Sequence, residues 1–231
     1  MARELIRRSL PSGRTARVVM SEITDGDVAA GHVTIGGPDD ASTDAKGWTR
    51  PWTLLDQVHG DGVVVVDAAG AQSGTRADAA VTSMVDVPLA IRVADCVPVA
   101  FLGDRCVGVA HAGWRGLRAG VLERTVEAMK RLDGITPVVA VVGPHIGACC
   151  YEFGDADLDD LADLFGSSIR STTTAGRPAL DLSSALSGIL VGAGIPMIHD
   201  GACTSCDDRY WSFRASATAR RQAMVAWTEE G

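Results

Sequence analysis

The chain has 231 residues, of which 46% are hydrophobic and 22% charged, a composition typical of a globular protein with a sizeable core. Its 29 acidic residues outnumber its 21 lysines and arginines, giving a formal net charge of -8, so we do not expect a nucleic-acid-binding protein. Its longest apolar runs, such as residues 63–66, fall far short of the ~20 residues that a membrane span requires, so we expect no membrane segment either.

The N-terminal residues carry charges but lack the apolar stretch and the cleavage site of a secretory signal, so we expect a cytoplasmic protein. Six cysteines are few for this length, and in a reducing compartment they are expected to be thiols, metal ligands or core residues. They are Cys96, Cys106, Cys149, Cys150, Cys203 and Cys206. Because the sequence shows no repeat and no low-complexity tract, we predict a single domain over residues 1–231.

Short β-branched runs, most of them ended by Gly, Pro or Asp, predict ten strands. These cover residues 17–21, 32–35, 54–58, 63–66, 89–93, 97–102, 107–111, 138–142, 196–199 and 222–227. An amphipathic pattern predicts a helix over 117–132, and weaker patterns predict helices around 158–165 and 182–190, the last with Asp181 as its N-cap. Strands outnumber helices and do not alternate with them, which predicts an α+β fold rather than a doubly wound sheet.

Three side chains that can bind a metal lie where loops meet predicted strands: His59, Cys96 and His111. Two imidazoles and one thiolate suit zinc and leave its fourth tetrahedral position for water or substrate. Their spacing matches no local zinc-finger signature. From spacing alone, a second interpretation stays open, in which Cys96 is a core residue and the histidines lie in hydrogen-bonded turns.

The segment His111-Ala112-Gly113-Trp114-Arg115-Gly116 joins a predicted strand to the predicted amphipathic helix. Free N–H groups at a helix N-terminus attract anions, and an arginine can hold a phosphate or carboxylate through two hydrogen bonds. The segment therefore indicates an anion site with Arg115 as its main ligand. A structural ion pair of Arg115 at a glycine-rich junction is the alternative.

A Cys-x-x-Cys pair, Cys203 and Cys206, lies near the C-terminus. A zinc ribbon needs a second pair at the same spacing, whereas Cys149 and Cys150 are adjacent. A thioredoxin motif is expected early in a βαβ unit. We therefore expect a loop with at most a locally reactive thiol.

Six motifs follow one another between residues 53 and 228. They are Gln57-Val58-His59-Gly60, Ala94-Asp95-Cys96-Val97-Pro98, the segment 111–116, Gly143-Pro144-x-Ile146-Gly147 with Tyr151-Glu152, Cys203-Thr204, and Ser212-Phe213-Arg214 with Thr218-Ala219-Arg220. In this order they resemble the family called laccase-domain proteins, multicopper polyphenol oxidases or peptidoglycan editing factors, whose members include purine nucleoside phosphorylases. The resemblance implies that His59, Cys96 and His111 are zinc ligands. It also implies a sandwich of mixed β-sheets with helices packed outside the sheets.

Residues 1–52 depart from this family. Its Gly-Gly-Val-Ser loop, Asn-Leu segment and Asn-Arg pair have no match there, so the N-terminal region looks shortened and divergent. Part of the substrate pocket is expected from that region, and the resemblance therefore supports the metal centre more strongly than any named substrate. Ala219 also stands where the family usually has Gly.

The names given to this family imply different reactions. Five histidines with no His-x-His pair cannot supply the ligands of several copper centres, so we reject a laccase. The resemblance instead implies zinc-dependent phosphorolysis of purine nucleosides such as inosine, with adenosine deaminase activity as a further option. We then expect Arg115 and Asp95 to be catalytic, and Gln57, Trp114 and Arg214 to bind the nucleoside or phosphate. Strand alternation would point Asp95 away from its neighbour Cys96, which leaves both proton transfer and a structural role open.

Two other functions remain open. Cys96 as a nucleophile with His111 as its base would make a cysteine hydrolase or amidase acting on peptidoglycan precursors. Such an enzyme would work without zinc and be blocked by alkylation of Cys96. A zinc-stabilised adaptor without catalytic activity would instead unfold on metal removal and tolerate replacement of Arg115.

Overall fold

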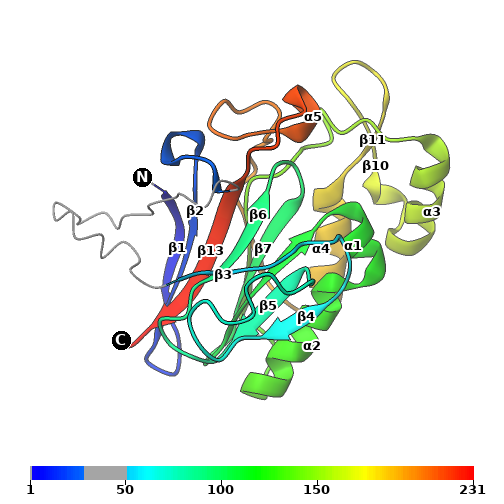
Figure 1. The fold of residues 1–231 in the computed structure, drawn as a ribbon. Helices are drawn as coiled ribbons and strands as arrows, with labels where there is room; N and C mark the ends of the chain where they lie inside the picture. The colour runs from blue at the N-terminus through cyan, green and yellow to red at the C-terminus, as the bar shows by residue number, and fades with distance from the viewer. Residues whose placement is uncertain (1, 29–50) are drawn as a thin grey trace.

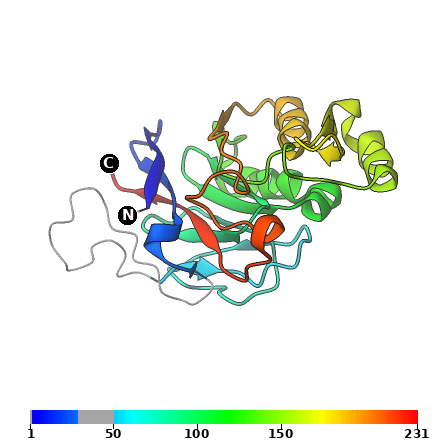
Figure 2. The same cartoon turned by 90° about the horizontal axis from the view of Figure 1, so that it is seen from above.

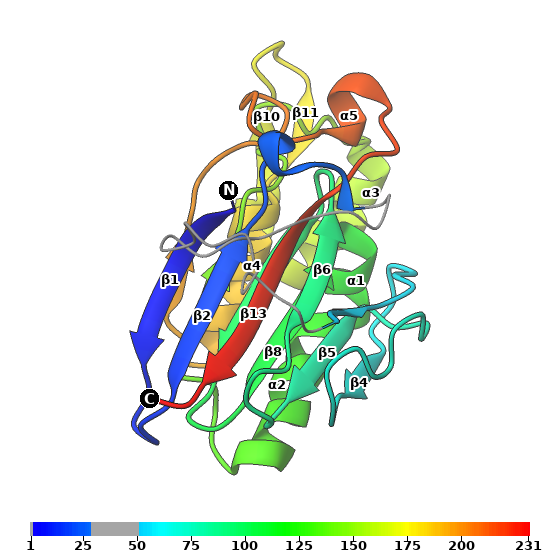
Figure 3. The same cartoon turned by 60° about the vertical axis from the view of Figure 1, so that its left-hand side comes forward.

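The computed structural model of the protein describes residues 2–28 and 51–231, and its ribbon is shown in Figure 1. Two β-sheets lie face to face, and helices cover the outer face of one of them. Figure 3 shows the smaller sheet in front with the helices behind the strands, and Figure 2 shows the helices gathered on one side. The predicted α+β fold, with helices outside a sandwich of mixed sheets, is confirmed.

The smaller sheet has five strands in the order β1-β2-β13-β6-β3. Their bounds are Arg3–Ser9 for β1, Thr15–Met20 for β2, Thr53–Leu54 for β3, Leu89–Val93 for β6 and Gln222–Glu229 for β13. Only β3 runs parallel to its neighbour. Val225 and Trp227 lie on the outer face of this sheet, where Val28 and Trp52 pack against them.

The larger sheet has six strands in the order β12-β9-β7-β8-β5-β4. Their bounds are Val63–Val65 for β4, Ala79–Thr82 for β5, Val97–Leu102 for β7, Val107–Ala112 for β8, Val139–Val142 for β9 and Met197–His199 for β12. The pairs β4–β5 and β9–β12 are parallel and the others antiparallel. As a result, one end of the sheet carries the last residues of β8, β9 and β12 and the first residues of β4, β5 and β7. This end is called the β8 edge below, because β8 ends there.

The core has two layers because the strands of the larger sheet are buried on both faces. Along β7, Val99 and Phe101 pack against the helices, while Ala100 and Leu102 pack against the smaller sheet. All four side chains are fully buried. Such a strand appears in the sequence as a continuous apolar run rather than as an alternating one.

The helices are α1 Trp114–Ala119, α2 Val121–Asp133, α3 Asp155–Phe165, α4 Leu182–Gly192 and α5 Phe213–Ser216. The single helix predicted over 117–132 is wrong, because Gly120 adopts φ +90°, a left-handed conformation that ends α1 and precedes α2. Asp181 is the N-cap of α4, as predicted, and accepts a hydrogen bond from the Ser184 N–H at 3.1 Å.

The remaining elements are the 3-10 turns Ile23–Asp25 and Ser167–Ile169 and a hairpin of β10, Arg170–Thr172, and β11, Pro178–Leu180. The sequence prediction missed this hairpin, β1 and β5, and it extended β3 to residue 58. The strand predicted at 32–35 lies outside the described residues. Within the described residues, no helix is long and apolar enough to cross a membrane.

Candidate functional site

The topology brings His59, Cys96 and His111 together at the β8 edge. Cys96 directly precedes β7, His111 lies near the end of β8, and His59 lies in the loop before β4. Residues Pro98 and His111 are paired across β7 and β8. The three potential ligand atoms all lie within 4.8 Å of one another, so this His59–Cys96–His111 group can hold a metal ion.

Asp78, which the sequence analysis missed, holds this group in place. It is fully buried at the start of β5, and His111 Nδ1 donates a hydrogen bond to Asp78 Oδ1 at 2.8 Å. The backbone N–H groups of His59 and Gly60 also donate to the Asp78 carboxylate, at 2.9 and 2.7 Å. His59 has φ +61°, so the carboxylate secures an uncommon backbone conformation.

The donor set and its spacing fit a zinc ion. His59 Nε2 lies 3.8 Å from Cys96 Sγ. A tetrahedral zinc with bonds of about 2.05 Å to nitrogen and about 2.3 Å to sulfur separates two such donors by roughly 3.6 Å. Because Nδ1 of His111 is engaged by Asp78, its Nε2 is left for a metal, an arrangement common among zinc ligands.

The same contacts favour a charged thiolate at Cys96. Burial acts to raise the pKa of Cys96, but hydrogen bonds with His111 and His59 outweigh it and lower the pKa to about 6. Burial acts to lower the pKa of His111, and hydrogen bonds with Asp78 and Cys96 raise it to about 9. A deprotonated thiolate is the form of cysteine that binds metals and acts as a nucleophile.

A pocket of about 580 Å³ opens beside the His59–Cys96–His111 group. All eight residues predicted from the sequence to form the site line it, together with seven further residues. The eight are Gln57, His59, Asp95, Cys96, His111, Trp114, Arg115 and Arg214. The structure therefore brings together motifs that lie up to 157 residues apart in the chain, since 214 − 57 = 157.

Two guanidinium groups in this pocket lack an acidic partner. Arg115 stacks over the Trp114 ring at 4.4 Å, and Arg214 lies over the Tyr151 ring at 5.2 Å. Among residues 2–28 and 51–231, no carboxylate lies within ion-pair distance of either group. The structural ion pair considered for Arg115 is therefore absent from that part of the chain. The Arg214 guanidinium donates one hydrogen bond, to the Glu152 carbonyl at 3.4 Å, and both cations keep donors for an anion. The other two arginines of the pocket, Arg92 and Arg221, donate to backbone carbonyls.

Asp95 is engaged on both oxygens. It accepts a hydrogen bond from Thr204 Oγ1 and another from the Arg214 N–H, each at 2.7 Å. The expectation from strand alternation is wrong, because β7 begins only at Val97 and Asp95 has φ +102°. Asp95 and Cys96 line the same pocket, and Asp95 anchors the segment that carries Arg214.

Gln57 has a similar anchoring contact. Its side-chain amide donates to the Arg92 carbonyl at 2.8 Å, and its side-chain oxygen accepts from the Arg92 N–H at 2.9 Å. Both polar atoms are thus paired with backbone. The substrate-binding role predicted for Gln57 stays a prediction.

Gly113 is required by close packing at the metal-capable group. A Cβ atom at this position would lie 3.0 Å from Cys96 Sγ and 3.1 Å from a ring carbon of His59. Any side chain there would push two potential ligands apart. This contact gives the first glycine of the segment 111–116 a packing role beside the metal-capable side chains.

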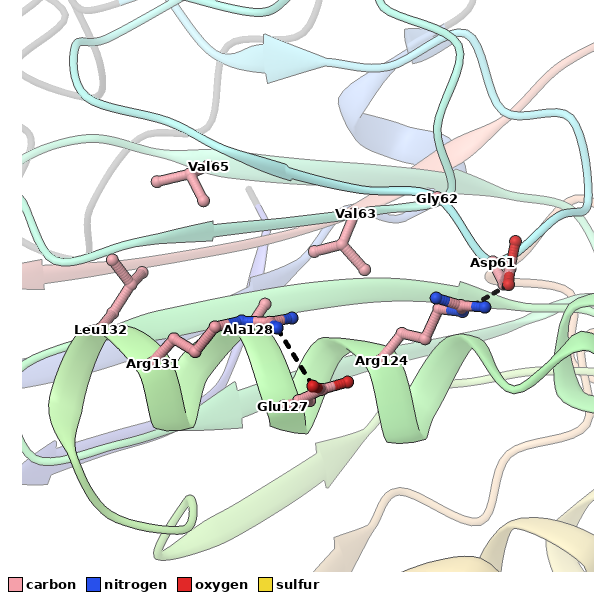
Figure 4. A pocket seen from close by; sticks show the side chains of 9 residues that line it. All are labelled: Asp61, Gly62, Val63, Val65, Arg124, Glu127, Ala128, Arg131 and Leu132. Atoms are coloured by element: carbon pink, nitrogen blue, oxygen red, sulfur yellow. Dashed lines mark hydrogen bonds and ion pairs between the residues drawn. The ribbon is translucent and has the colours of Figure 1, made fainter.

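A second hollow, of about 450 Å³, lies between α2 and β4 (Figure 4). Its arginines are paired: Arg124 with Asp61 at 2.5 Å and Arg131 with Glu127 at 3.0 Å. Figure 4 shows the Arg131–Glu127 pair along the surface of α2, whereas the Arg124–Asp61 pair joins α2 to the loop before β4. None of the residues predicted to form a site lines this hollow.

Residues 40–229 match the model of the family described as multi-copper polyphenol oxidoreductase laccase. The chain belongs to this family. A relative named purine nucleoside phosphorylase, from Corynebacterium glutamicum, is 37% identical over 182 residues, which cover 75% of this chain and 72% of the relative. Another of that name, from Streptomyces coelicolor, is 38% identical over 185 residues, covering 76% and 74%.

Solved structures of similar proteins share the fold. YlmD from Geobacillus stearothermophilus has a TM-score of 0.73 at 27% identity, covering 95% of this chain and 94% of its own. The hypothetical protein YfiH from Bacillus licheniformis has a TM-score of 0.75 at 26% identity, covering 96% and 98%. The family resemblance found in the motifs is confirmed by both kinds of comparison.

The sequence alone gave no functional role to some residues in or beside the pocket. Tyr151 and Phe213 line the pocket and lie in motifs that were noted, but no role was assigned to them. Phe213 is 56% exposed, unusual for a phenylalanine, and offers an apolar surface at the pocket. Asp78 lies in no motif, and only the register of β5 beside β8 reveals its contact with His111.

Proposed function

We propose that this protein is a zinc-dependent purine nucleoside phosphorylase. The observation that carries the proposal is the pocket itself, in which the His59–Cys96–His111 group lies beside two guanidinium groups without acidic partners. The curated relatives named purine nucleoside phosphorylase support the same reaction. In phosphorolysis, a phosphate oxygen forms a bond to C1′ of the ribose while the bond from C1′ to the purine nitrogen breaks. The products are ribose 1-phosphate and the free purine.

The phosphate is held by Arg115 and Arg214. A guanidinium binds phosphate through two parallel hydrogen bonds, and pairing with a charged partner contributes about 1.5–3 kcal/mol per hydrogen bond. Asp95 positions the Arg214 backbone, because its two oxygens accept hydrogen bonds from the Arg214 N–H and from Thr204 Oγ1. Arg115 therefore acts on the substrate directly, and Asp95 acts as a positioning residue.

The purine is held by aromatic side chains. Trp114, Tyr151 and Phe213 line the pocket. Aromatic side chains stack on the flat face of any nucleobase, including a purine. Burial and the nearby Cys96 raise the pKa of Tyr151 to about 12, so its hydroxyl stays protonated at neutral pH. A neutral hydroxyl can donate a hydrogen bond to the departing purine.

The metal is proposed to be zinc, on His59, Cys96 and His111. A bound zinc ion would supply Lewis acidity at its open position and lower the pKa of a bound water. The same property would permit hydrolytic removal of the amino group of adenosine. Copper in several centres is not proposed, since the chain has only five histidines.

The test is purine release from inosine by protein whose zinc content has been measured, with and without phosphate. We expect hypoxanthine and ribose 1-phosphate in equal amounts, only with phosphate, with loss of turnover on chelation and recovery with zinc. Equal hypoxanthine release with and without phosphate would indicate a hydrolase. No hypoxanthine release in either case would remove inosine as a substrate. Ammonia release from adenosine tests the deaminase activity in the same preparations.

The low pKa of Cys96 also favours one alternative, a cysteine hydrolase or amidase acting on peptidoglycan precursors. In that case Cys96 is the nucleophile and His111, oriented by Asp78, its base. Activity would survive chelation and be abolished by iodoacetamide. If Cys96 binds zinc, the results are reversed. Chelation then abolishes activity, and iodoacetamide reacts with Cys96 only after the metal has been removed.

A further inference from the structure

Four of the six cysteines gather at a second place on the β8 edge. The parallel strands β9 and β12 both end there, and each is followed by a turn that carries two cysteines. The turn after β9 carries Cys149 and Cys150, and the turn after β12 carries Cys203 and Cys206. Their sulfur atoms all lie within 4.8 Å of one another, and they are called the four-cysteine cluster below.

The two turns are joined along their backbones before the cysteines meet. His145 and Cys203 form a parallel bridge, the His145 N–H donates to the Ala202 carbonyl at 3.3 Å, and the Thr204 N–H donates to the His145 carbonyl at 3.0 Å. The Cys149 carbonyl accepts a hydrogen bond from the Thr174 N–H at 3.0 Å. The cluster therefore rests on fixed backbone rather than on two independent loops.

The sulfur spacing fits one tetrahedral ion. Cys149 Sγ lies 3.7 Å from Cys206 Sγ, and Cys150 Sγ lies 3.2 Å from the same atom. Four thiolates around zinc, with bonds of about 2.3 Å, are separated by roughly 3.8 Å. A disulfide has a bond of about 2.05 Å, so none of these sulfurs is covalently paired here.

Gly147 lies directly against the cluster. Its N–H donates a hydrogen bond to Cys203 Sγ at 3.1 Å. A Cβ at Gly147 would lie 3.2 Å from Cys149 Sγ and 3.3 Å from Cys203 Cβ. Glycine thus lets the first turn close directly onto the second.

We propose that Cys149, Cys150, Cys203 and Cys206 bind a second zinc ion, in a closed structural site distinct from the His59–Cys96–His111 group. Four protein thiolates leave no position for a substrate, and such closed sites contribute folding energy rather than catalysis. Binding releases the protons of the four thiols. The ion would fasten together two turns that lie next to the pocket. Tyr151, which lines the pocket, follows Cys150, and Thr204, which donates to the pocket residue Asp95, follows Cys203.

This second site would act on the pocket through Asp95. Thr204 donates to one Asp95 oxygen, and the other oxygen holds the Arg214 N–H. The Tyr151 ring lies under the Arg214 guanidinium at 5.2 Å. A cross-link between the two turns therefore fixes the Asp95 and Tyr151 contacts of Arg214 without touching the substrate.

The experiment is the zinc content of the folded protein, purified in reducing buffer with zinc supplied and measured by elemental analysis. We expect two zinc ions per chain in the unchanged protein and one in the double variant Cys149→Ser, Cys206→Ser. The variant His111→Ala is expected to keep one zinc ion per chain. The triple variant that combines these three changes is expected to bind no zinc. Cys106→Ser, at a buried cysteine outside the cluster, is the matched control and keeps two.

A second measurement counts the thiolate ligands by spectroscopy. The protein is stripped of zinc and loaded with Co²⁺, and its sulfur-to-cobalt charge-transfer absorption is compared with that of the double variant. The unchanged protein has five expected thiolate ligands, Cys96 and the cluster, and the double variant at most three, so the band should fall by about 40% or more. Loading of the His59–Cys96–His111 group alone leaves one thiolate and the same band in both proteins.

Three results would overturn the second site. One is wild-type zinc content in the double variant, and another is a His111→Ala protein that is folded but free of zinc. The third is protein purified in reducing buffer with zinc supplied, in which all four cluster thiols are free and no second metal is present. Because zinc content is measured without turnover, a failure of the proposed phosphorylase reaction leaves this test unaffected.

Discussion

Two cysteine-containing groups lie at the same sheet edge and differ in what surrounds them. The His59–Cys96–His111 group mixes imidazole and thiolate, lines a pocket of about 580 Å³, and has arginines without acidic partners beside it. The four-cysteine cluster has sulfur donors only, and none of its members lines that pocket. The first arrangement leaves room for a reacting molecule and the second does not.

One edge of the sheet thus carries a group suited to a reaction, His59–Cys96–His111, and a group suited to a structural role, the four-cysteine cluster. The three metal-capable side chains of the first group line one pocket together with Arg115 and Arg214, an arrangement that suits a reaction between two bound partners. Sulfur atoms of the second group face one another across two joined turns. Each prediction below tests whether the first group performs the reaction while more distant parts of the molecule do not.

The largest effect is expected for His111→Ala, which removes a ligand of the first group. Loss of a Lewis acid that contributes several kcal/mol corresponds to a decrease in kcat of roughly 1,000-fold or more. The variant should lose one zinc per chain by elemental analysis. The matched control is His199→Ala. His199 also lies at the β8 edge but belongs to neither metal-capable group, so this variant should keep its zinc content and its turnover. Full zinc retention in His111→Ala would refute the ligand assignment.

Asp78→Asn should have the next largest effect, because it keeps the shape of the side chain and removes its charge. Loss of a carboxylate behind a histidine ligand typically weakens metal binding by about 10–100-fold. Turnover should therefore recover as zinc is raised, which a titration of activity against free zinc would show. Asp61→Asn, at an exposed carboxylate paired with Arg124, is the control. Identical zinc affinity in Asp78→Asn and the unchanged protein would contradict the role of Asp78.

Arg115→Ala should act on phosphate and leave the metal in place. A lost charged hydrogen bond of about 1.5–3 kcal/mol raises the KM for phosphate by roughly 10–150-fold. Zinc content and the KM for inosine should change little. Arg118→Ala lies on the same helix but pairs with Asp160 at 3.8 Å, outside the pocket, so it provides the matched control. An unchanged phosphate KM would remove Arg115 from the anion site.

Much of the fold could be predicted from the sequence where burial is complete on both faces of a strand. The predicted strands 89–93 and 97–102 agree with β6 and β7 because apolar runs between turn residues leave few alternatives. β1 was missed because its residues Arg3, Glu4, Arg7 and Arg8 make it polar, and it is a strand only through pairing with β2. The break at Gly120 was missed because a glycine inside a helical pattern does not reveal its φ angle.

The site was predictable wherever its residues lie in motifs. The types of His59, Cys96 and His111 and their positions beside strands left two interpretations open, and the resemblance of the motifs to the family singled out the metal; the structure brings the three together. Asp78 was not, since its contact depends on the register of β5 against β8, which no local pattern encodes. The four-cysteine cluster was missed for the same reason: Cys149 and Cys150 are adjacent in sequence, and only the parallel pairing of β9 and β12 brings them to Cys203 and Cys206.

The smallest effect is expected for Arg131→Ala, in the hollow of Figure 4. This hollow also contains arginines, but Arg131 is bound to Glu127 at 3.0 Å and both side chains are more than 60% exposed. Exposed pairs four residues apart on a helix contribute about 0.3–0.5 kcal/mol, so the melting temperature and both KM values should change very little. Enzyme kinetics and thermal unfolding of Arg131→Ala beside Arg115→Ala provide the measurement. A phosphate KM raised equally in both variants would mean that long-range charge, rather than the unpaired arginines of the pocket, attracts the anion.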